Sequence, residues 1–314
     1  MAEFGYDIDY AKKLLENDSL VAIPTETVYG LAANATSSIA VTKIFKTKER
    51  PSFDPLIIHT YSLDRLNDYV TSIPYKATLL TKRFWPGALT LLLPKKSNIP
   101  DIVTSGLDTV AVRVPNHPLT LALLKSLSFP LAAPSANPFG YISPTLAQHV
   151  NNQLGDKIEY ILDGGACEVG IESTIIGFEN ALPTVHRLGG VSVEDIESII
   201  GEVDVKPHSS SNPVAPGMLQ NHYAPKKKLI IGNIDKLLQH HDNVGIISFQ
   251  KQYNIQHQIQ LSKKGDLDEA AQTLFGAMRQ LDNEDISLII SEYVPNIGLG
   301  RAINDRLKRA AIKQ

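Results

Sequence analysis

The chain has 314 residues, a length that accommodates one large domain or two modest ones with a substantial core. Hydrophobic residues make up 43% and charged residues 20%, which excludes disordered, collagen-like and disulfide-scaffold proteins. The single cysteine, Cys167, cannot form an internal disulfide, so we expect a reducing compartment. A formal net charge of −3 gives no electrostatic reason to expect tight binding of nucleic acid.

The distribution of apolar and charged residues narrows the class further. No stretch of 18 apolar residues occurs, and the first residues contain no long apolar segment, so we expect a soluble, cytoplasmic protein that does not enter a membrane. Residues 1–200 carry 16 Lys and Arg against 21 Asp and Glu, whereas residues 229–314 carry 10 of each. An acidic first part argues against a surface that follows the phosphates of RNA non-specifically.

Residues 1–201 predict alternating helices and strands from the spacing of their apolar positions. The expected helices are 8–17, 37–50, 61–70, 78–85, 117–127, 144–155 and 191–201, and the expected strands are 19–24, 56–59, 88–94, 109–115, 129–137, 160–165 and 173–178. Pro86 and Gly87 end the fourth helix, and Pro118 fits the first turn of the fifth. This alternation is typical of one α/β domain of about 200 residues.

Residues 202–228 differ in composition from both sides of the chain. Four prolines, a run of three serines and little periodicity predict a linker, and composition alone is compatible with a passive tether. After the linker, strands are expected at 228–233, 243–249 and 286–294, and amphipathic helices at 267–283 and 300–313. We therefore expect a second, small α/β domain at 229–314.

Polar residues gather at the ends of several expected strands. Arg113 lies within a strand, where a buried charge needs either an acidic partner or an anionic ligand. Each of the other motifs is by itself also typical of a helix cap, a solvated helix end or a turn: PTETVYGL (24–31), KTKER (46–50), AAPSANPFG (132–140), GIESTIIG (170–177) and HRLGG (186–190). Together they are typical of a binding site built from loops at strand ends.

The order of these motifs is similar to that of the threonylcarbamoyl-AMP synthases. The similarity covers residues 20–200, the YrdC-like catalytic domain of that family, with its K-x-R signature at Lys48 and Arg50 and its S-x-N signature at Ser135 and Asn137. The linker sequence PGM…HYAP and the small second domain resemble the long, two-domain form of the family. Neither a Walker A motif nor a GxGxxG loop is present, so side chains would have to hold the phosphates of any nucleotide.

The resemblance implies a fold and a reaction. The expected fold is α/β: a YrdC-like twisted mixed sheet with helices and a concave cavity (1–201), a linker or lid over the site (202–228) and a small Rossmann-like domain (229–314). The implied reaction converts L-threonine, bicarbonate or CO2, and ATP with its Mg²⁺ into L-threonylcarbamoyl-AMP and pyrophosphate. Downstream tRNA threonylcarbamoyl-transfer proteins use that product at tRNA position 37, and direct tRNA binding by this chain is possible but not indicated.

The resemblance also assigns residues. Lys48 and Arg50 are the expected catalytic pair that neutralises triphosphate charge, and no residue is expected to ligate a metal. The remaining expected ATP-binding residues are Asp54, Thr109, Ser135, Asn137, Ser143, Arg187 and Tyr223, and the expected threonine-binding residues are Thr27, His59, Arg113, Ala133 and Ser173. The family often has Asn at the position of Asp54, and the linker positions Ala215 and Leu219 also depart from its pattern.

The sequence leaves Cys167 and His222 outside these assignments and allows two alternative functions. Cys167 is expected to be a buried thiol and not a nucleophile, and His222 fits either closure over a ligand or a structural hydrogen bond. One alternative function is a non-catalytic module that binds double-stranded RNA or tRNA, against which the acidic first domain argues. The other is a carbamoyl-transfer domain of a hydrogenase-maturation enzyme, which would carry zinc-finger cysteines that this sequence lacks.

Overall fold

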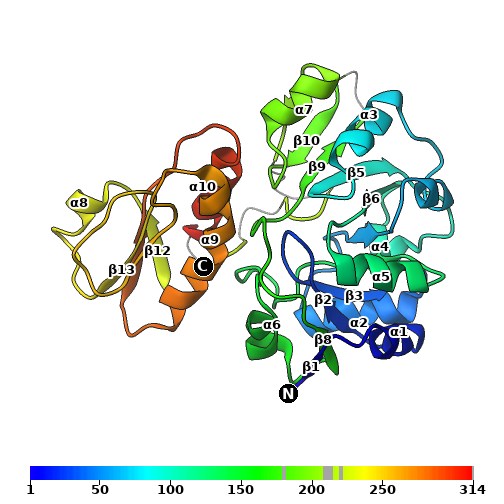
Figure 1. The fold of residues 1–314 in the computed structure, drawn as a ribbon, viewed down its shortest axis with the longest axis horizontal. Coiled ribbons are helices and arrows are strands. Elements are labelled where there is room, and N and C mark those ends of the chain that lie inside the picture. The colour runs from blue at the N-terminus through cyan, green and yellow to red at the C-terminus, as the bar shows by residue number, and fades with distance from the viewer. Residues whose placement is uncertain (179–181, 208–214, 219–221, 313–314) are drawn as a thin grey trace.

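The computed structural model describes residues 1–178, 182–207, 215–218 and 222–312. The chain forms two α/β domains, each with its own sheet, and helices α9 and α10 of the second domain face the first domain (Figure 1). The fold is mixed α/β, as expected from the sequence. Within the described ranges, no helix is long and apolar enough to cross a membrane.

The large domain is built on a mixed sheet of 11 strands in the order β1-β8-β2-β3-β7-β4-β6-β5-β9-β10-β11. Strand β5 pairs antiparallel with β6 and parallel with β9. The strands are β1 Glu3–Gly5, β2 Val21–Ile23, β3 Gly30–Asn34, β4 Ile57–His59, β5 Leu89–Pro94, β6 Thr109–Arg113, β7 Leu131–Ala132, β8 Tyr160–Leu162, β9 Thr174–Gly177, β10 Thr184–Arg187 and β11 Asp204–Val205.

Helices cover this sheet because successive residues of a strand face opposite sides. Val21 and Ile23 pack with helices α1 and α5, whereas Ala22 between them joins the core on the other face. The helices are α1 Ile8–Glu16, α2 Ser38–Lys48, η1 Asp64–Asp68 (a 3₁₀ helix), α3 Tyr75–Phe84, α4 Asp101–Thr104, α5 Pro118–Ser126, α6 Ala147–Leu154 and α7 Val193–Ile200.

The second domain has a parallel sheet of four strands in the order β12-β15-β13-β14. Ile247 and Ile289 pack against α9 and α10, whereas Ile246 and Ile290 form a small cluster on the opposite face with Ile234. The elements are β12 Lys228–Ile231, α8 Ile234–Leu237, β13 Val244–Ser248, β14 Gln258–Gln260, α9 Leu267–Asn283, β15 Leu288–Ser291 and α10 Gly300–Ala310.

Several elements differ from the sequence-based expectation. The helix expected at 61–70 is only a short 3₁₀ helix, which has no side-chain hydrogen bond at its N-cap. The strand expected at 129–137 is reduced to Leu131–Ala132, because the flanking prolines have no N–H to donate to a ladder. Strand β11 lies inside the range expected as linker and pairs with β10. The division at 201 and 228 therefore stays a prediction.

Candidate active site

A pocket on the large domain collects the strand-end motifs, and the linker covers it. Its cavity volume is about 50 Å³ in this structure. Ile57 and His59 on β4 face this pocket, whereas Ile58 between them faces the main core. The lining residues are Thr25, Thr27, Val28, Gly30, Arg50, Leu56, Ile57, His59, Arg113, Ala133, Pro134, Ser135, Glu172, Ser173, Arg187, Pro216, Gly217, His222 and Tyr223.

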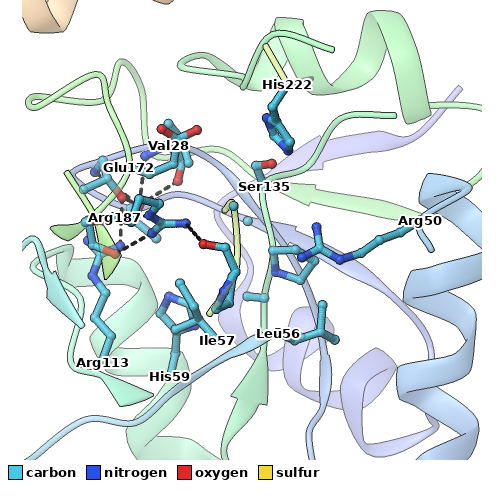
Figure 2. A pocket seen from close by; sticks show the side chains of 18 of the residues that line it. Val28, Arg50, Leu56, Ile57, His59, Arg113, Ser135, Glu172, Arg187 and His222 are labelled. Atoms are coloured by element: carbon cyan, nitrogen blue, oxygen red, sulfur yellow. Dashed lines mark hydrogen bonds between the residues drawn. The ribbon is translucent and has the colours of Figure 1, made fainter. Parts of the chain in front are cut away.

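Three buried arginines line this pocket: Arg50, Arg113 and Arg187. Figure 2 shows Arg50 and Arg113 entering from opposite sides, with Arg187 and Glu172 close together along another wall. Each arginine comes from a different part of the sheet, since Arg50 follows α2, Arg113 ends β6 and Arg187 ends β10. The arrangement surrounds a small volume with positive charge, which suits an anionic ligand.

Arg113 is held by the motif that follows β2. Its Nη1 donates to Thr27 Oγ1 at 2.9 Å, its Nε donates to the Gly87 carbonyl at 3.0 Å, and its Nη2 forms an ion pair with Glu26. The sequence left two possibilities for this arginine, an acidic partner or an anionic ligand. The structure supplies the acidic partner and also places Arg113 in the pocket wall.

Arg187 is fixed against the start of β9. Its Nε donates to the Ser173 carbonyl and its Nη2 to Ser173 Oγ, both at 3.0 Å. Ser173 Oγ is also 2.7 Å from Thr90 Oγ1, so a short chain of hydroxyls continues into β5. Burial lowers the pKa of Arg187 to about 10, and the side chain therefore stays a cation at neutral pH.

The end of α2 positions Lys48 and Arg50 differently. Glu49 between them adopts a left-handed conformation (φ 55°), which turns the chain so that Lys48 and Arg50 are both buried. Lys48 Nζ donates to the carbonyls of Ser135, at 2.6 Å, and Asn137. Arg50 Nη2 forms a 2.9 Å ion pair with Asp54, and its Nε donates to the Asp54 carbonyl. Burial and the nearby Arg50 lower the pKa of Lys48 well below its ordinary value.

The S-x-N loop and the segment before β9 meet at one wall. Asn137 Nδ2 donates to the carbonyls of Pro138 and Tyr141, so this side chain stabilises its own loop. Ser143 Oγ donates to Glu172 Oε1 at 2.5 Å. Burial raises the pKa of Glu172, but Arg306, Arg187 and Ser143 more than offset this, so the pKa lies below its ordinary value.

His59 lies beside Arg113 in the floor of the pocket (Figure 2). Burial, and next the positive charge of Arg113, lower the pKa of His59 to about 3. The imidazole is therefore neutral at physiological pH. A neutral ring adds a hydrogen-bonding group to the pocket without adding charge.

The described part of the linker lies over this pocket. Ala215 and Met218 pack against Ile57 and Ala111 of the sheet, and His222 and Tyr223 line the pocket. The Tyr223 ring stacks on Phe275 of α9 at 5.5 Å between centroids. Tyr223 has positive φ (66°) and its side chain is buried. The departure noted at Leu219 lies outside the described residues.

Of the fourteen site residues expected from the sequence, nine line the pocket and five do not. Lys48, Asn137 and Ser143 support the loops, Asp54 pairs with Arg50, and Thr109 lies at the far end of β6 from Arg113. The nine that line the pocket are Thr27, Arg50, His59, Ala133, Arg113, Ser135, Ser173, Arg187 and Tyr223. Their binding roles stay predictions.

Two carboxylates of the site were given no role from the sequence. Glu26 pairs with Arg113, and Glu172 accepts from Ser143 and from Arg306 of the second domain. Both lie inside motifs already singled out, but their partners are distant in sequence. The expectation for Cys167, a buried thiol, agrees with the structure, since burial raises its pKa to about 12.

Two models of known protein families match this chain. A family model of Sua5, YciO and YrdC proteins, described as "Telomere recombination", matches residues 13–189. A second model, described as "Threonylcarbamoyl-AMP synthase, C-terminal domain", matches residues 191–312. The first domain of this chain, whose mixed sheet carries the arginine-lined pocket, therefore belongs to the Sua5, YciO and YrdC class. An E. coli YciO structure with 21% identity and a TM-score of 0.53, covering 60% of this chain and 96% of its own, shares the fold.

Full-length relatives narrow the class to one family. A Bacillus subtilis protein named threonylcarbamoyl-AMP synthase is 42% identical over 97% of this chain and 92% of its own length. A Pyrococcus abyssi protein of the same name is 41% identical over 98% and 94%. The crystal structure of P. abyssi Sua5 complexed with L-threonine has a TM-score of 0.92 at 41% identity, covering 97% of this chain and 94% of its own. The chain belongs to the threonylcarbamoyl-AMP synthase family, in its two-domain form.

Proposed function

We propose that this enzyme forms L-threonylcarbamoyl-AMP and pyrophosphate from L-threonine, bicarbonate or CO2, and ATP. The observation that carries the proposal is the pocket in which Arg50, Arg113 and Arg187 converge. The names of the full-length relatives and the threonine complex of the P. abyssi protein support it. The substrates together bring a triphosphate and two carboxylate-like groups, and such ligands require this concentration of positive charge.

The proposed chemistry needs orientation and charge neutralisation more than a nucleophilic side chain. The threonine amine attacks CO2 and loses a proton, which gives a carbamate. A carbamate oxygen then attacks the α-phosphorus of ATP while the bond to the pyrophosphate oxygen breaks and pyrophosphate leaves. Transfer to phosphorus depends mainly on positioning and on stabilising the charge of the phosphates.

We propose that threonine binds at the Arg113 side of the pocket. Nε and Nη1 of Arg113 donate to Gly87 and Thr27, and Nη2 forms an ion pair with Glu26, so N–H groups on Nη1 and Nη2 are left among the described residues for a substrate carboxylate. The flat guanidinium matches a carboxylate with two parallel hydrogen bonds. The remaining expected threonine residues, His59, Ala133 and Ser173, line the same pocket.

We propose that ATP binds on the side of Arg50, Ser135 and Arg187, with Tyr223 above it. Lys48 would act by holding the carbonyls of the S-x-N loop as well as by its charge. The described residues contain no group of three or more His, Cys, Asp or Glu that could hold a metal ion. Asp54 is paired with Arg50, so Mg²⁺ would enter on the phosphates of ATP as part of the substrate.

We propose that residues 202–228 act as a lid as well as a connection. Two neighbouring aromatic side chains of this segment, His222 and Tyr223, line the pocket, and their ring centroids are 4.1 Å apart. A passive tether has no reason to bury an aromatic side chain there. The lid would exclude water from an adenylate that hydrolyses readily.

The product would be passed to downstream proteins that modify tRNA position 37, and a cytoplasmic location is part of this proposal. A non-catalytic RNA-binding module is not favoured, because the converging arginines are buried in a small pocket and not spread over a surface. Mass spectrometry tests the reaction. With ¹³C-bicarbonate, L-threonine and ATP, we expect an adenylate that contains the label, and its absence from the full-length enzyme would refute the reaction.

A further inference from the structure

One arginine of the second domain reaches the wall of the pocket. Arg306 on α10 has a fully buried side chain. Its Nε donates to Glu172 Oε2 at 3.0 Å, and its Nη2 donates to the Leu188 carbonyl at 2.7 Å. Glu172 itself lines the pocket, and its other oxygen accepts the Ser143 hydroxyl. A side chain outside the large domain therefore holds a carboxylate of the site.

The same guanidinium also supports the linker. The Arg306 Cζ atom lies 4.9 Å from the centroid of the Tyr223 ring, and Arg309 lies 4.7 Å from it. The Tyr223 ring stacks on Phe275, so three side chains of α9 and α10 contact one tyrosine of the pocket. Cation–π contacts of this kind are strengthened when the groups are away from water. Arg306 thus contacts two walls of the pocket, the linker tyrosine and Glu172.

The charge of Glu172 depends on this neighbourhood. The groups that face its carboxylate are Ser143, Arg187 of β10, Arg306 of α10 and Tyr223 of the linker. A buried carboxylate without a cation is protonated or moves toward water, because burial penalises the charged form. Removing Arg306 would take away the cation that donates a hydrogen bond to it.

We propose that Arg306 is a positioning residue, through which α10 fixes Glu172 and Tyr223 in the wall of the substrate pocket. The second domain is then a working part of the site and not an independent module. This inference rests on the proposed function for its kinetic readout. Arg306 is argued to act through Glu172 and Tyr223, and the geometry does not require it to touch a substrate.

The test compares two arginines of the same helix in the full-length protein. Arg301 also crosses to the large domain, where it pairs with Glu194 at 2.9 Å, but this pair is partly exposed and belongs to no wall of the pocket. We expect Arg306→Gln to lower kcat for adenylate formation at least tenfold and to weaken ATP binding, measured by calorimetry, at least tenfold. Arg301→Gln should stay within about twofold in both. Equal effects of the two substitutions would overturn the proposal.

A pH profile separates positioning from general support of the fold. In Arg306→Gln the pKa of Glu172 rises, so adenylate formation should fall with decreasing pH in a range where the wild type is unaffected. Adding Glu172→Gln should remove that acid limb. Arg306→Gln with the profile of the wild type would contradict the proposal.

The Arg306→Lys variant and the calorimetry of the wild type separate a folding defect, and a failure of the proposed reaction, from the role of Arg306. If Arg306→Gln does not fold, Arg306→Lys keeps the charge but loses the planar fork, and it should still weaken ATP binding more than Arg301→Gln does. An Arg306→Lys variant with the activity and the ATP affinity of the wild type would refute the inference. Because calorimetry needs no turnover, a wild type that binds ATP but forms no adenylate would refute the proposed function alone.

Discussion

At the scale of single residues, the cations of the pocket are held in place before any substrate arrives. Arg113 pairs with Glu26 and Arg50 pairs with Asp54, while Arg187 donates to the oxygens of Ser173. Each guanidinium is therefore restricted to one orientation, and less conformational entropy is lost when an anion binds. The cost is that two of the three positive charges are partly neutralised.

Arg113→Lys tests how the threonine carboxylate is recognised. Lysine keeps the charge but cannot reproduce the hydrogen bonds to Gly87 and Thr27 together with a two-point contact to a carboxylate. We expect the KM for threonine to rise about 10- to 100-fold, from the loss of roughly 1.5–3 kcal/mol, with little change in the KM for ATP. Initial rates with each substrate varied in turn measure both constants. An increased KM for ATP with unchanged threonine KM would place Arg113 on the nucleotide side.

Lys48→Ala and Arg50→Ala test the phosphate side. Each substitution removes charge-assisted hydrogen bonds, and loss of Lys48 also releases the carbonyls of Ser135 and Asn137. Adenylate formation should fall on the order of 10- to 200-fold for each variant. Lys46→Ala, at an exposed position in the same helix turn, is the matched control and should keep its activity. Wild-type rates in both test variants would show that Lys48 and Arg50 do not stabilise the phosphates of ATP.

The half-buried His149 predicts a loss of stability in mild acid. Burial and the nearby Arg279 lower the pKa of His149 from 6.5 to about 4. Below pH 6.5 the unfolded state binds a proton that the folded state does not, so stability is intact above pH 6.5 and is lost as the pH falls toward 4. After allowance for solvent screening, His149 should contribute roughly 1 kcal/mol to the difference between pH 7.5 and 5.

Urea unfolding at the two pH values measures this contribution. His149→Gln should reduce the difference in unfolding free energy between pH 7.5 and 5. His240→Gln, at an exposed position after α8, serves as the control for replacing a histidine. An unchanged difference in His149→Gln would show that another group is responsible.

Sequence analysis predicted the residues of this pocket better than their partners. Arg50, Arg113 and Arg187 stand in recognisable motifs, and all three line the pocket. The contact between Arg306 and Glu172 joins residues 134 positions apart. Neither local periodicity nor a motif contains information about such a contact, because only the packing of α10 against the large domain creates it.

At the scale of elements, sequence patterns also fail to predict short strands that depend on contacts between distant residues. The long amphipathic helices α9 and α10 follow from apolar spacing, and the structure contains both. β3 (Gly30–Asn34) was missed because its small residues show no alternation, although both its neighbours in the sheet hold it in register. Tertiary pairing decides such strands, since their local preference is weak.

The linker is the element whose role is most easily tested. Tyr223→Ala removes a ring that lines the pocket and stacks on Phe275. If the segment is a lid, the variant should continue to consume ATP while threonylcarbamoyl-AMP fails to accumulate, because water reaches the intermediate. Pyrophosphate release and adenylate yield, measured in the same reaction, give the ratio. A ratio equal to that of the wild type would mean that the linker is only a tether.

At the scale of the whole molecule, the two domains share a core. One hydrophobic cluster contains Phe275 and Ile303 of the second domain together with Val28, Ile171 and Tyr223. At Gly170 the backbone approaches α9 so closely that an added Cβ would lie 2.4 Å from the Gln272 Cα atom. Such direct packing explains how helices of the second domain can shape a pocket built on the sheet of the first.

The proposed reaction predicts how pyrophosphate release depends on the substrates. The full-length enzyme is incubated with MgATP, and pyrophosphate is measured with L-threonine and bicarbonate together, with each alone and with neither. We expect rapid release only when both are present, because the carbamate that attacks ATP is made from both. Release at the same rate without threonine or without bicarbonate would refute the proposed reaction.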